Sequence, residues 1–430
     1  MGQNYSIKSK NTIIYVLAIM IRVFLAIYQI FFFSWPPKPW GQLIIGILEP
    51  YQDYKFYYRK FAEEFVHAGW LPYLSNSSDP ILASFLYPPF FLYVISVPAI
   101  LNADLVFFPL LLADILLPGV IYQFLKHFHE EEVAQWGFLA IAFCPLSIFY
   151  NGGFLFNMSL VVLVFVVSLY FVYVKRFKWA TFTLAISFLF KQIILFFIVP
   201  ILLYTILKSA ENEPIVISYL KQTIIHCGIL GGTLFVGSLP WLLLAPGNYL
   251  GTLFMGQRPT LAPDFDSRHL TWPVHWYSFL IELKAPYWLL YVVGFLNFTM
   301  LGIIIVQLTS VGLLLYWYKK NSLDWLKILD LVVYTAVLSH LFLPRGVYKY
   351  YFTLHVPLVI LWICFHIGSS LAASPSQYNK FLLLFLITSL IILILHRLLY
   401  LLFFWLILIL MLKWSLSFAF MSQNNNLLEN

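Results

Sequence analysis

The stretch FNMSLVVLVFVVSLYFVYVKR, residues 156–176, decides the fold class of this chain. Its apolar run covers 156–174 and stops at the cationic pair Lys175 and Arg176. A helix needs about 20 mostly apolar residues to cross the hydrocarbon core of a bilayer. Similar runs recur along the chain, so the sequence predicts an all-α, polytopic membrane protein.

The composition points the same way. The chain has 430 residues, of which 62% are hydrophobic and only 10% are charged. Soluble domains carry roughly 25% charged residues, and polar surface this sparse could not cover such an apolar interior in water. We therefore predict no soluble domain of any size. The net charge of +7 comes from short clusters between apolar runs, which indicates topology signals and phosphate contacts rather than nucleic-acid binding.

We predict about twelve spans. They lie near 12–33, 104–126, 134–150, 156–174, 179–190, 192–207, 222–245, 287–317, 327–343, 350–370, 381–396 and 398–419. Cytoplasmic segments of membrane proteins are enriched in Lys and Arg. Lys8 and Lys10 therefore place the N-terminus in the cytoplasm, and the C-terminus follows on the same side. Alternation then puts these cations inside as well: Lys126, Lys175, Arg176, Lys178, Lys208, Lys221, Lys319, Lys320, Lys327 and Lys380.

This alternation works only if the apolar stretch 86–101 makes no single net crossing. We predict that it forms a helix lying in, or dipping into, the outer leaflet. Two long segments, 34–103 and 247–286, and a shorter one, 344–349, then face outward. The unusual chemistry of the chain collects in these segments and at the outer ends of the spans.

The first outer segment contains an amphipathic pattern over residues 49–65, which predicts an interfacial helix ending at His67-Ala-Gly69. Asp53 stands at or just before its start. A carboxylate there caps a helix, and it also suits a general base held at the membrane face. Both interpretations can hold at once, because capping fixes the carboxylate in place.

Three further polar positions stand out within or beside the spans. Asp114 lies in the middle of an apolar run, where a carboxylate must be paired, protonated or functional. Residues 151–157 form a tight outer turn, bounded by Asn151 and Asn157, whose glycines allow close backbone approach. Lys191, followed by Gln192, either snorkels to the membrane face or meets a lipid-linked phosphate.

The second outer segment mixes carboxylates, cations and aromatic residues. Asp264 and Asp266 have a spacing that binds divalent cations in many sugar-nucleotide enzymes, but the pattern is common by chance, so they are weak metal candidates. Arg258, Arg268 and His269 are candidates for clamping a phosphate. Trp272 and Trp276 suit either stacking on sugar rings or an interfacial belt. Later in the chain, Arg345 and Lys349 suit either snorkelling or phosphate recognition.

Four of these features, taken in order, resemble the GT-C superfamily of polyprenyl-phosphate-sugar-dependent glycosyltransferases. The likeness is greatest to the endoplasmic-reticulum asparagine-linked-glycosylation glucosyltransferases and to the mannosyltransferases of GPI-anchor and archaeal glycan assembly. It rests on Asp53 before an aromatic-rich helix, on Tyr87-Pro88-Pro89-Phe90, on the turn 151–157 and on Lys191-Gln192.

The resemblance covers residues 12–208 and thins after them. The chain is expected to be one membrane domain, 1–430, with a GT-C-like half at 12–208, variable helices at 209–421 and a disordered tail at 422–430. One departure concerns the late His-Glu-Lys stretch of the family's glucosyltransferases. This chain has Val347-Tyr348-Lys349 there, so only the lysine carries over and the identity of the sugar stays open.

The resemblance implies transfer of a hexose, mannose or glucose, from a polyprenyl or dolichyl phosphate to a lipid-linked glycan, with inversion, on the non-cytoplasmic face. Asp53 would be the catalytic base. The donor phosphate would be bound by Lys191, Arg345, Lys349 and Arg268. The substrate groove would include Tyr54, Tyr87, Pro88, Pro89, Asp114, Asn151, Asn157, Gln192, His269, Trp272 and Trp276. No cofactor would be required, and a divalent cation is the alternative.

Three other interpretations remain open: a transporter or flippase of lipid-linked sugars, an enzyme of the same superfamily that glycosylates protein directly or moves an oligosaccharide, and a non-catalytic subunit of a membrane glycosylation complex. The membrane would be that of an archaeal cell or of the endoplasmic reticulum. We expect lipid partners and no nucleic acid.

Overall fold

The structure is a computed structural model. It describes residues 2–32, 53–74, 79, 81–82, 85, 87–211, 216–255, 280–281, 283–298, 301–342, 349–372 and 375–395. Within these ranges every regular element is helical. In chain order they are α1 (Gly2–Ile27), η1 (Tyr28–Phe32), η2 (Asp53–Tyr58), α3 (Arg59–His67), α4 (Pro89–Ala99), η4 (Ala103–Val106), α5 (Phe107–Lys126), α6 (Glu131–Ala142), η5 (Ser147–Gly153), α7 (Met158–Tyr173), α8 (Phe177–Phe190), η6 (Gln192–Ile194), α9 (Leu195–Ala210), α10 (Val216–Leu244), α11 (Pro246–Leu250), η7 (Gly251–Met255), α13 (Tyr287–Phe298), α14 (Leu301–Lys319), α15 (Trp325–Phe342), η9 (Lys349–Tyr351), α16 (Phe352–Ala372) and α17 (Pro375–Ile394).

Five helical segments of the described chain are long and apolar enough to cross a membrane. They are Ile13–Phe31, Ala103–Lys126, Gln192–Ala210, Val216–Leu244 and Leu301–Lys319. A sixth arises if α6 and η5, which are bent by 59° at their junction, count as one span. The chain is therefore an all-α protein with several membrane-length helices. The total of twelve stays a prediction, and the last predicted span, 398–419, lies outside the described residues.

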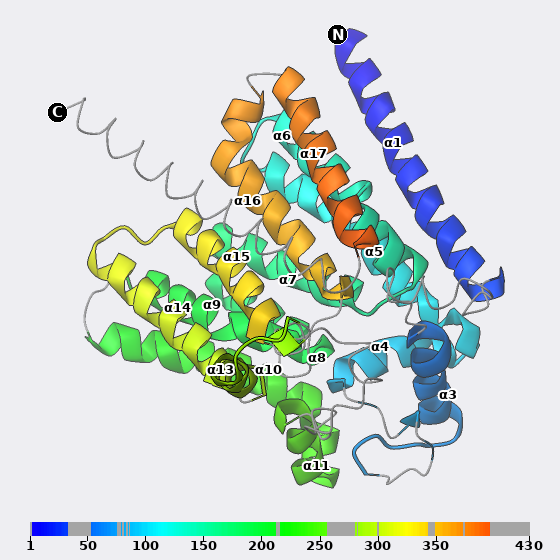
Figure 1. Cartoon of the computed structure of the whole chain (residues 1–430), viewed down its shortest axis with the longest axis vertical. Coiled ribbons are helices and arrows are strands. Elements are labelled where there is room, and N and C mark those ends of the chain that lie inside the picture. Colours follow the sequence, from blue (N-terminus) through cyan, green and yellow to red (C-terminus); the bar gives the residue numbers. More distant parts are fainter. Residues whose placement is uncertain are drawn as a thin grey trace.

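The stretch 86–101 contains the short helix α4, whose 11 residues extend for only about 16 Å at the usual helical rise. Pro89 opens α4 at a position where its missing N–H costs nothing. The helix packs against α3 and η4, and Figure 1 shows it with α3 at the end of the molecule opposite the N-terminus. A helix this short agrees with the prediction that 86–101 does not cross on its own, while its depth in the leaflet stays a prediction.

Hydroxyl groups join the central helices. Ser159 at the start of α7 donates to the carbonyl of Leu110 in α5, at 2.9 Å, and Ser168 donates to the carbonyl of Ala180 in α8, at 2.8 Å. Ser187 of α8 returns a bond to the carbonyl of Val161, at 3.0 Å. Small hydroxyl residues let helices approach closely in lipid and satisfy their own polar atoms there.

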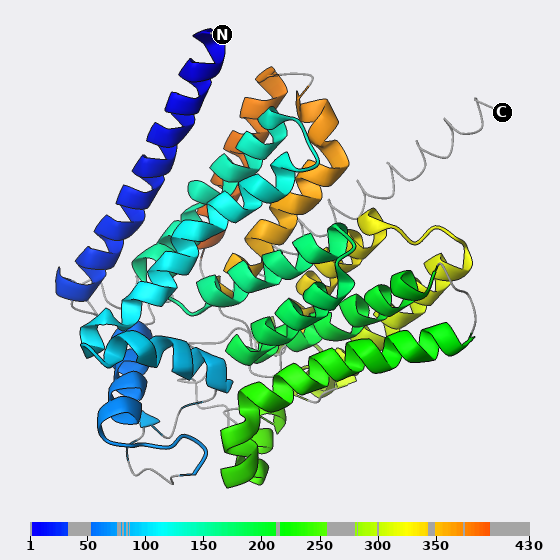
Figure 2. The same cartoon turned by 180° about the vertical axis from the view of Figure 1, so that it is seen from behind.

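The helices form two groups. α1, α5 and α6 lie on one side and α9, α10 and α14 on the other, as both views show (Figures 1 and 2). α16 contacts α15 as well as α6 and α7, so it links the two groups. The C-terminal end of α8 lies close to α4, where the rings of Phe190 and Phe90 are 6.2 Å apart, and Lys191 directly follows this end.

Candidate functional site

Asp53 begins a continuous helical segment formed by η2 and α3, as the amphipathic pattern predicted. Tyr58 and Phe61 of this segment are fully buried, and the chain leaves the helix at Gly69, whose φ of +65° suits glycine. The Asp53 carboxylate is half-buried and accepts a hydrogen bond from the Tyr58 hydroxyl, at 3.3 Å. The buried aromatic face thus fixes the backbone that carries this carboxylate.

Lys191 lies at the junction of α8 and η6, where an extended backbone (φ −161°, ψ 134°) interrupts the helix. Its side chain is only 6% exposed, and Nζ donates to Asn157 Oδ1 at 2.9 Å. The ammonium also lies over the rings of Tyr350 and Tyr351, 4.9 and 5.1 Å from their centroids. Lys191 is therefore enclosed by protein and does not snorkel to the surface.

Asp53 and Lys191 interact electrostatically without forming a direct ion pair. Burial raises the pKa of the Asp53 carboxyl, and the opposing effects of Lys191 and of the Tyr58 hydroxyl are smaller. Burial likewise lowers the pKa of the Lys191 ammonium, and the Asp53 charge offsets only part of that change. Each charge is thus costly in the folded protein and only partly compensated by the other.

Tyrosine rings surround this pair. Tyr87 lies 5.8 Å from the ring of Tyr58 and 5.9 Å from the Lys191 ammonium. Tyr350 stacks on Phe156 at 4.3 Å, with an angle of 10° between the rings. Of these tyrosines, Tyr87 was predicted from the sequence, whereas Tyr350 and Tyr351 were not, although they directly follow Lys349.

Asp114 occupies a separate buried cluster. Its carboxylate pairs with Arg22 Nε at 2.7 Å and accepts from the Ser147 hydroxyl at 3.1 Å. Arg22 also donates to the last carbonyl of α6, Ala142, at 2.6 Å. The turn at Gly152 comes so close that an added Cβ would lie 3.1 Å from Arg22 and 3.3 Å from Asp114.

The structure thus shows Asp114 in an ion pair with Arg22. No contact joins Asp114 to Asp53 or Lys191 in the described chain, and its role in the substrate groove stays a prediction. Sequence reasoning missed Arg22, whose signal was a lone cation inside the first apolar run. Asn151 is fully buried in the adjoining turn. The hydroxyl of Tyr54 donates to the carbonyl of Asp104 at 2.9 Å, so this tyrosine anchors η2 to η4.

Other predicted site residues are described in part or not at all. Pro88 and Pro89 form the start of α4, Gln192 opens η6 beside Lys191, and Lys349 opens η9. Asp264, Asp266, Arg268, His269, Trp272, Trp276 and Arg345 lie outside the described residues. Among the residues that the structure does describe, no group of three or more His, Cys, Asp or Glu side chains could hold a metal ion.

Comparisons with known proteins give little at the level of sequence. No family model matches the chain, and no curated protein matches it. Three chains of solved structures match. One is the oligosaccharyltransferase of Archaeoglobus fulgidus in complex with zinc and sulfate, with 14% identity and a TM-score of 0.44. The match covers 90% of this chain and 52% of that one, so this chain spans about half the archaeal protein's length.

Proposed function

We propose that this chain is a membrane glycosyltransferase. It moves a hexose, mannose or glucose, from a polyprenyl or dolichyl phosphate to a lipid-linked glycan, with inversion at the anomeric carbon. The reaction takes place on the non-cytoplasmic face of an archaeal cell membrane or of the endoplasmic reticulum. The observation that carries the proposal is that one carboxylate and one enclosed cation flank the same tyrosine cluster. The Tyr58 hydroxyl donates to Asp53 at 3.3 Å, and the Tyr87 ring lies 5.8 Å from the Tyr58 ring and 5.9 Å from the Lys191 ammonium.

In this proposal Asp53 takes the proton from an acceptor hydroxyl. The acceptor oxygen forms a bond to the anomeric carbon, and the bond from that carbon to the donor phosphate breaks, leaving its electron pair on the phosphate oxygen. The raised pKa of Asp53 suits a general base, because proton transfer is most effective when the base's pKa approaches the working pH.

Lys191 stabilises the negative charge that grows on the leaving phosphate. Asn157 and the tyrosine rings hold the ammonium in place before the substrate arrives, so little reorganisation is needed during the reaction. Burial lowers the pKa of the Lys191 ammonium, because the charge has lost its water and Asp53 offsets only part of that loss. In this proposal the donor phosphate supplies the remaining counter-charge. Lys349, Arg345 and Arg268 complete the phosphate site in this proposal.

The test is the variant Asp53→Asn in a purified assay with polyprenyl-phosphate mannose or glucose as donor. Loss of a general base should lower the transfer rate by about 10²–10⁴-fold. The matched control is Glu63→Gln, an exposed carboxylate on the same helical segment, which should retain transfer. Wild-type transfer by the Asp53→Asn protein would refute the assignment of the base.

The same preparation separates the enzyme from a flippase of lipid-linked sugars. The proposal requires that the donor be consumed and that polyprenyl phosphate be released in equal amount. Movement of the intact donor between leaflets with no release of polyprenyl phosphate would favour the flippase instead.

A further inference from the structure

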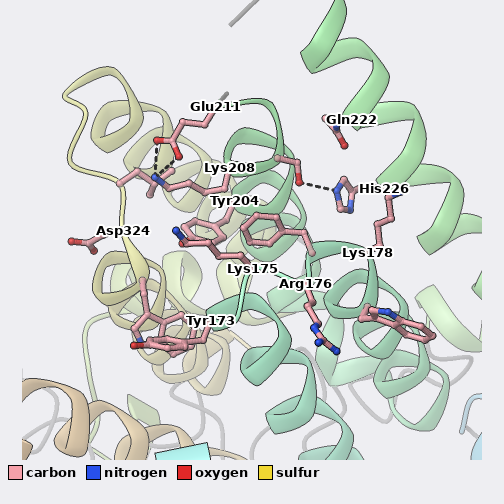
Figure 3. Close-up of a pocket in the computed structure, with 15 residues that line it drawn as sticks. Tyr173, Lys175, Arg176, Lys178, Tyr204, Lys208, Glu211, Gln222, His226 and Asp324 are labelled. Atoms are coloured by element: carbon pink, nitrogen blue, oxygen red, sulfur yellow. Dashed lines mark hydrogen bonds and ion pairs between the residues drawn. The ribbon is translucent and has the colours of Figure 1, made fainter. Parts of the chain in front are cut away.

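A second polar site lies at the opposite end of α8 from Lys191. It is a cavity of about 980 Å³ around the first turn of this helix. Since α8 has 14 residues, the two sites are separated by about 20 Å of helix. The cavity's charged lining residues are Lys175, Arg176, Lys178, Lys208, Glu211 and Asp324, all labelled in Figure 3.

Four cations line the cavity against two carboxylates. Both carboxylates already have partners: Glu211 pairs with Lys208 at 2.9 Å, and Asp324 accepts from the backbone N–H of Lys327 at 2.9 Å in the first turn of α15. Within the described part of the chain, Lys175, Arg176 and Lys178 form no ion pair. An excess of positive charge therefore remains.

The position of these three cations adds to the excess. Lys175 and Arg176 immediately precede α8, and Lys178 is its second residue. The N-terminus of a helix carries a partial positive charge, so cations there repel it and an anion is stabilised. In addition, the side chain of the N-cap residue Arg176 makes no capping hydrogen bond. The cavity therefore has the electrostatics of an anion site.

The surface beside the cavity is apolar. Trp179 and Phe182 on α8 are 57% and 39% exposed. A ligand with an anionic head and a hydrocarbon chain satisfies both surfaces at once, whereas a free anion would use only the cavity.

We infer that this cavity binds the phosphate headgroup of an anionic membrane lipid, whose acyl chains lie along the exposed rings of Trp179 and Phe182 on α8. The volume accommodates a phosphodiester headgroup, since ligand sites commonly have volumes of about 300–1,000 Å³. Basic pockets between membrane helices on the cytoplasmic side are suited to such headgroups. The predicted topology places these cations on that side. The inference does not depend on the proposed transferase activity.

The test is retention of phosphatidylglycerol by the purified full chain, counted by native mass spectrometry. The variant is Arg176→Gln combined with Lys178→Gln. Each cation near anionic lipid contributes roughly five-fold in affinity, so the double variant should bind about 25-fold more weakly. The matched control is Lys319→Gln with Lys320→Gln, two exposed cations at the end of α14 outside the cavity lining, and binding should stay within about two-fold.

Two further arms identify the ligand. Phosphatidylcholine, which has the same phosphate but no net charge, should be retained far less than phosphatidylglycerol. Inorganic phosphate should displace the bound lipid only when the phosphate concentration is far above the lipid concentration in the sample. Equal retention of the two lipids, equal loss in both variants, or displacement by free phosphate at the lipid's own concentration would overturn the inference. The charge-preserving pair Arg176→Lys and Lys178→Arg, which should retain the lipid, shows whether a loss in the Gln variant reflects charge or misfolding.

Discussion

In the described chain, the pair Arg22 and Asp114 and the pair Asp53 and Lys191 are built differently. Arg22 and Asp114 touch at 2.7 Å, and both side chains are essentially inaccessible. The guanidinium also donates to the carbonyls of Ile141 and Ala142. Asp53 and Lys191, in contrast, interact without contact.

The difference distinguishes a structural ion pair from a site prepared for a ligand. A buried charge is stabilised only when a counter-charge and hydrogen bonds replace its water. Arg22 and Asp114 supply these to each other, which ties α1 to α5 and to the end of α6. Asp53 and Lys191 leave part of the requirement unmet, because within the described chain neither of them forms an ion pair. We propose that substrate meets the remainder.

The largest effect is expected from breaking the contact pair. Arg22→Met leaves the Asp114 carboxylate buried without its cation, which should lower the free energy of unfolding by about 3–5 kcal/mol. A denaturant titration in mixed micelles measures this change. The double variant Arg22→Met with Asp114→Leu should recover most of the loss, because no charge is then left unpaired. No recovery would mean that the stabilisation comes from packing rather than from charge.

A smaller effect, on a different quantity, is expected at the other pair. Lys191→Gln should lower kcat/KM for transfer by about 10²-fold, because a preorganised positive group near the leaving phosphate is lost. Its free energy of unfolding should not fall as it does in Arg22→Met, since the buried ammonium is poorly compensated in the free protein. Kinetics and unfolding of the same preparation check both statements. Destabilisation as large as that of Arg22→Met would make Lys191 a structural residue.

The smallest effect is a change in pH dependence. The raised pKa of Asp53 means that its base form is populated only at higher pH than for an ordinary carboxylate, so activity should rise with pH by about ten-fold per unit below that pKa. The lowered pKa of Lys191 means that its charge is lost earlier, so activity should fall again at higher pH. The profile of kcat/KM should therefore be a bell.

Lys191→Arg sharpens this prediction. A guanidinium stays protonated throughout the accessible pH range, so the falling limb should disappear while the rising limb stays. A falling limb that survives in Lys191→Arg would show that another group causes it.

Part of this arrangement could be read from the sequence. The aromatic spacing predicted the helix that begins near Asp53 and its end at Gly69, because helical periodicity and a glycine stop are local signals. The enclosure of Lys191 by Tyr350 and Tyr351 could not be predicted. Those rings belong to η9, far from Lys191 in the sequence, and no local pattern links the two segments. The partner of Asp114 was equally hidden, since Arg22 lies on another helix.

The predicted span over 287–317 is described as α13 and α14, on the two sides of residues 299–300. The cavity around the first turn of α8 was not predicted either, because four separate segments of the chain contribute its lining.

The sequence alone determined that the chain is helical and suited to a membrane, because the length and the polarity of each apolar run are local properties that can be compared directly with the thickness of a bilayer. It also marked Asp53, Asn157 and Lys191 as unusual, because polar groups are costly beside apolar runs. Only the tertiary structure decided which charges meet. Arg22 reaches Asp114 and cancels it, whereas Lys191 approaches Asp53 without contact, since pairing depends on how helices distant in sequence are packed.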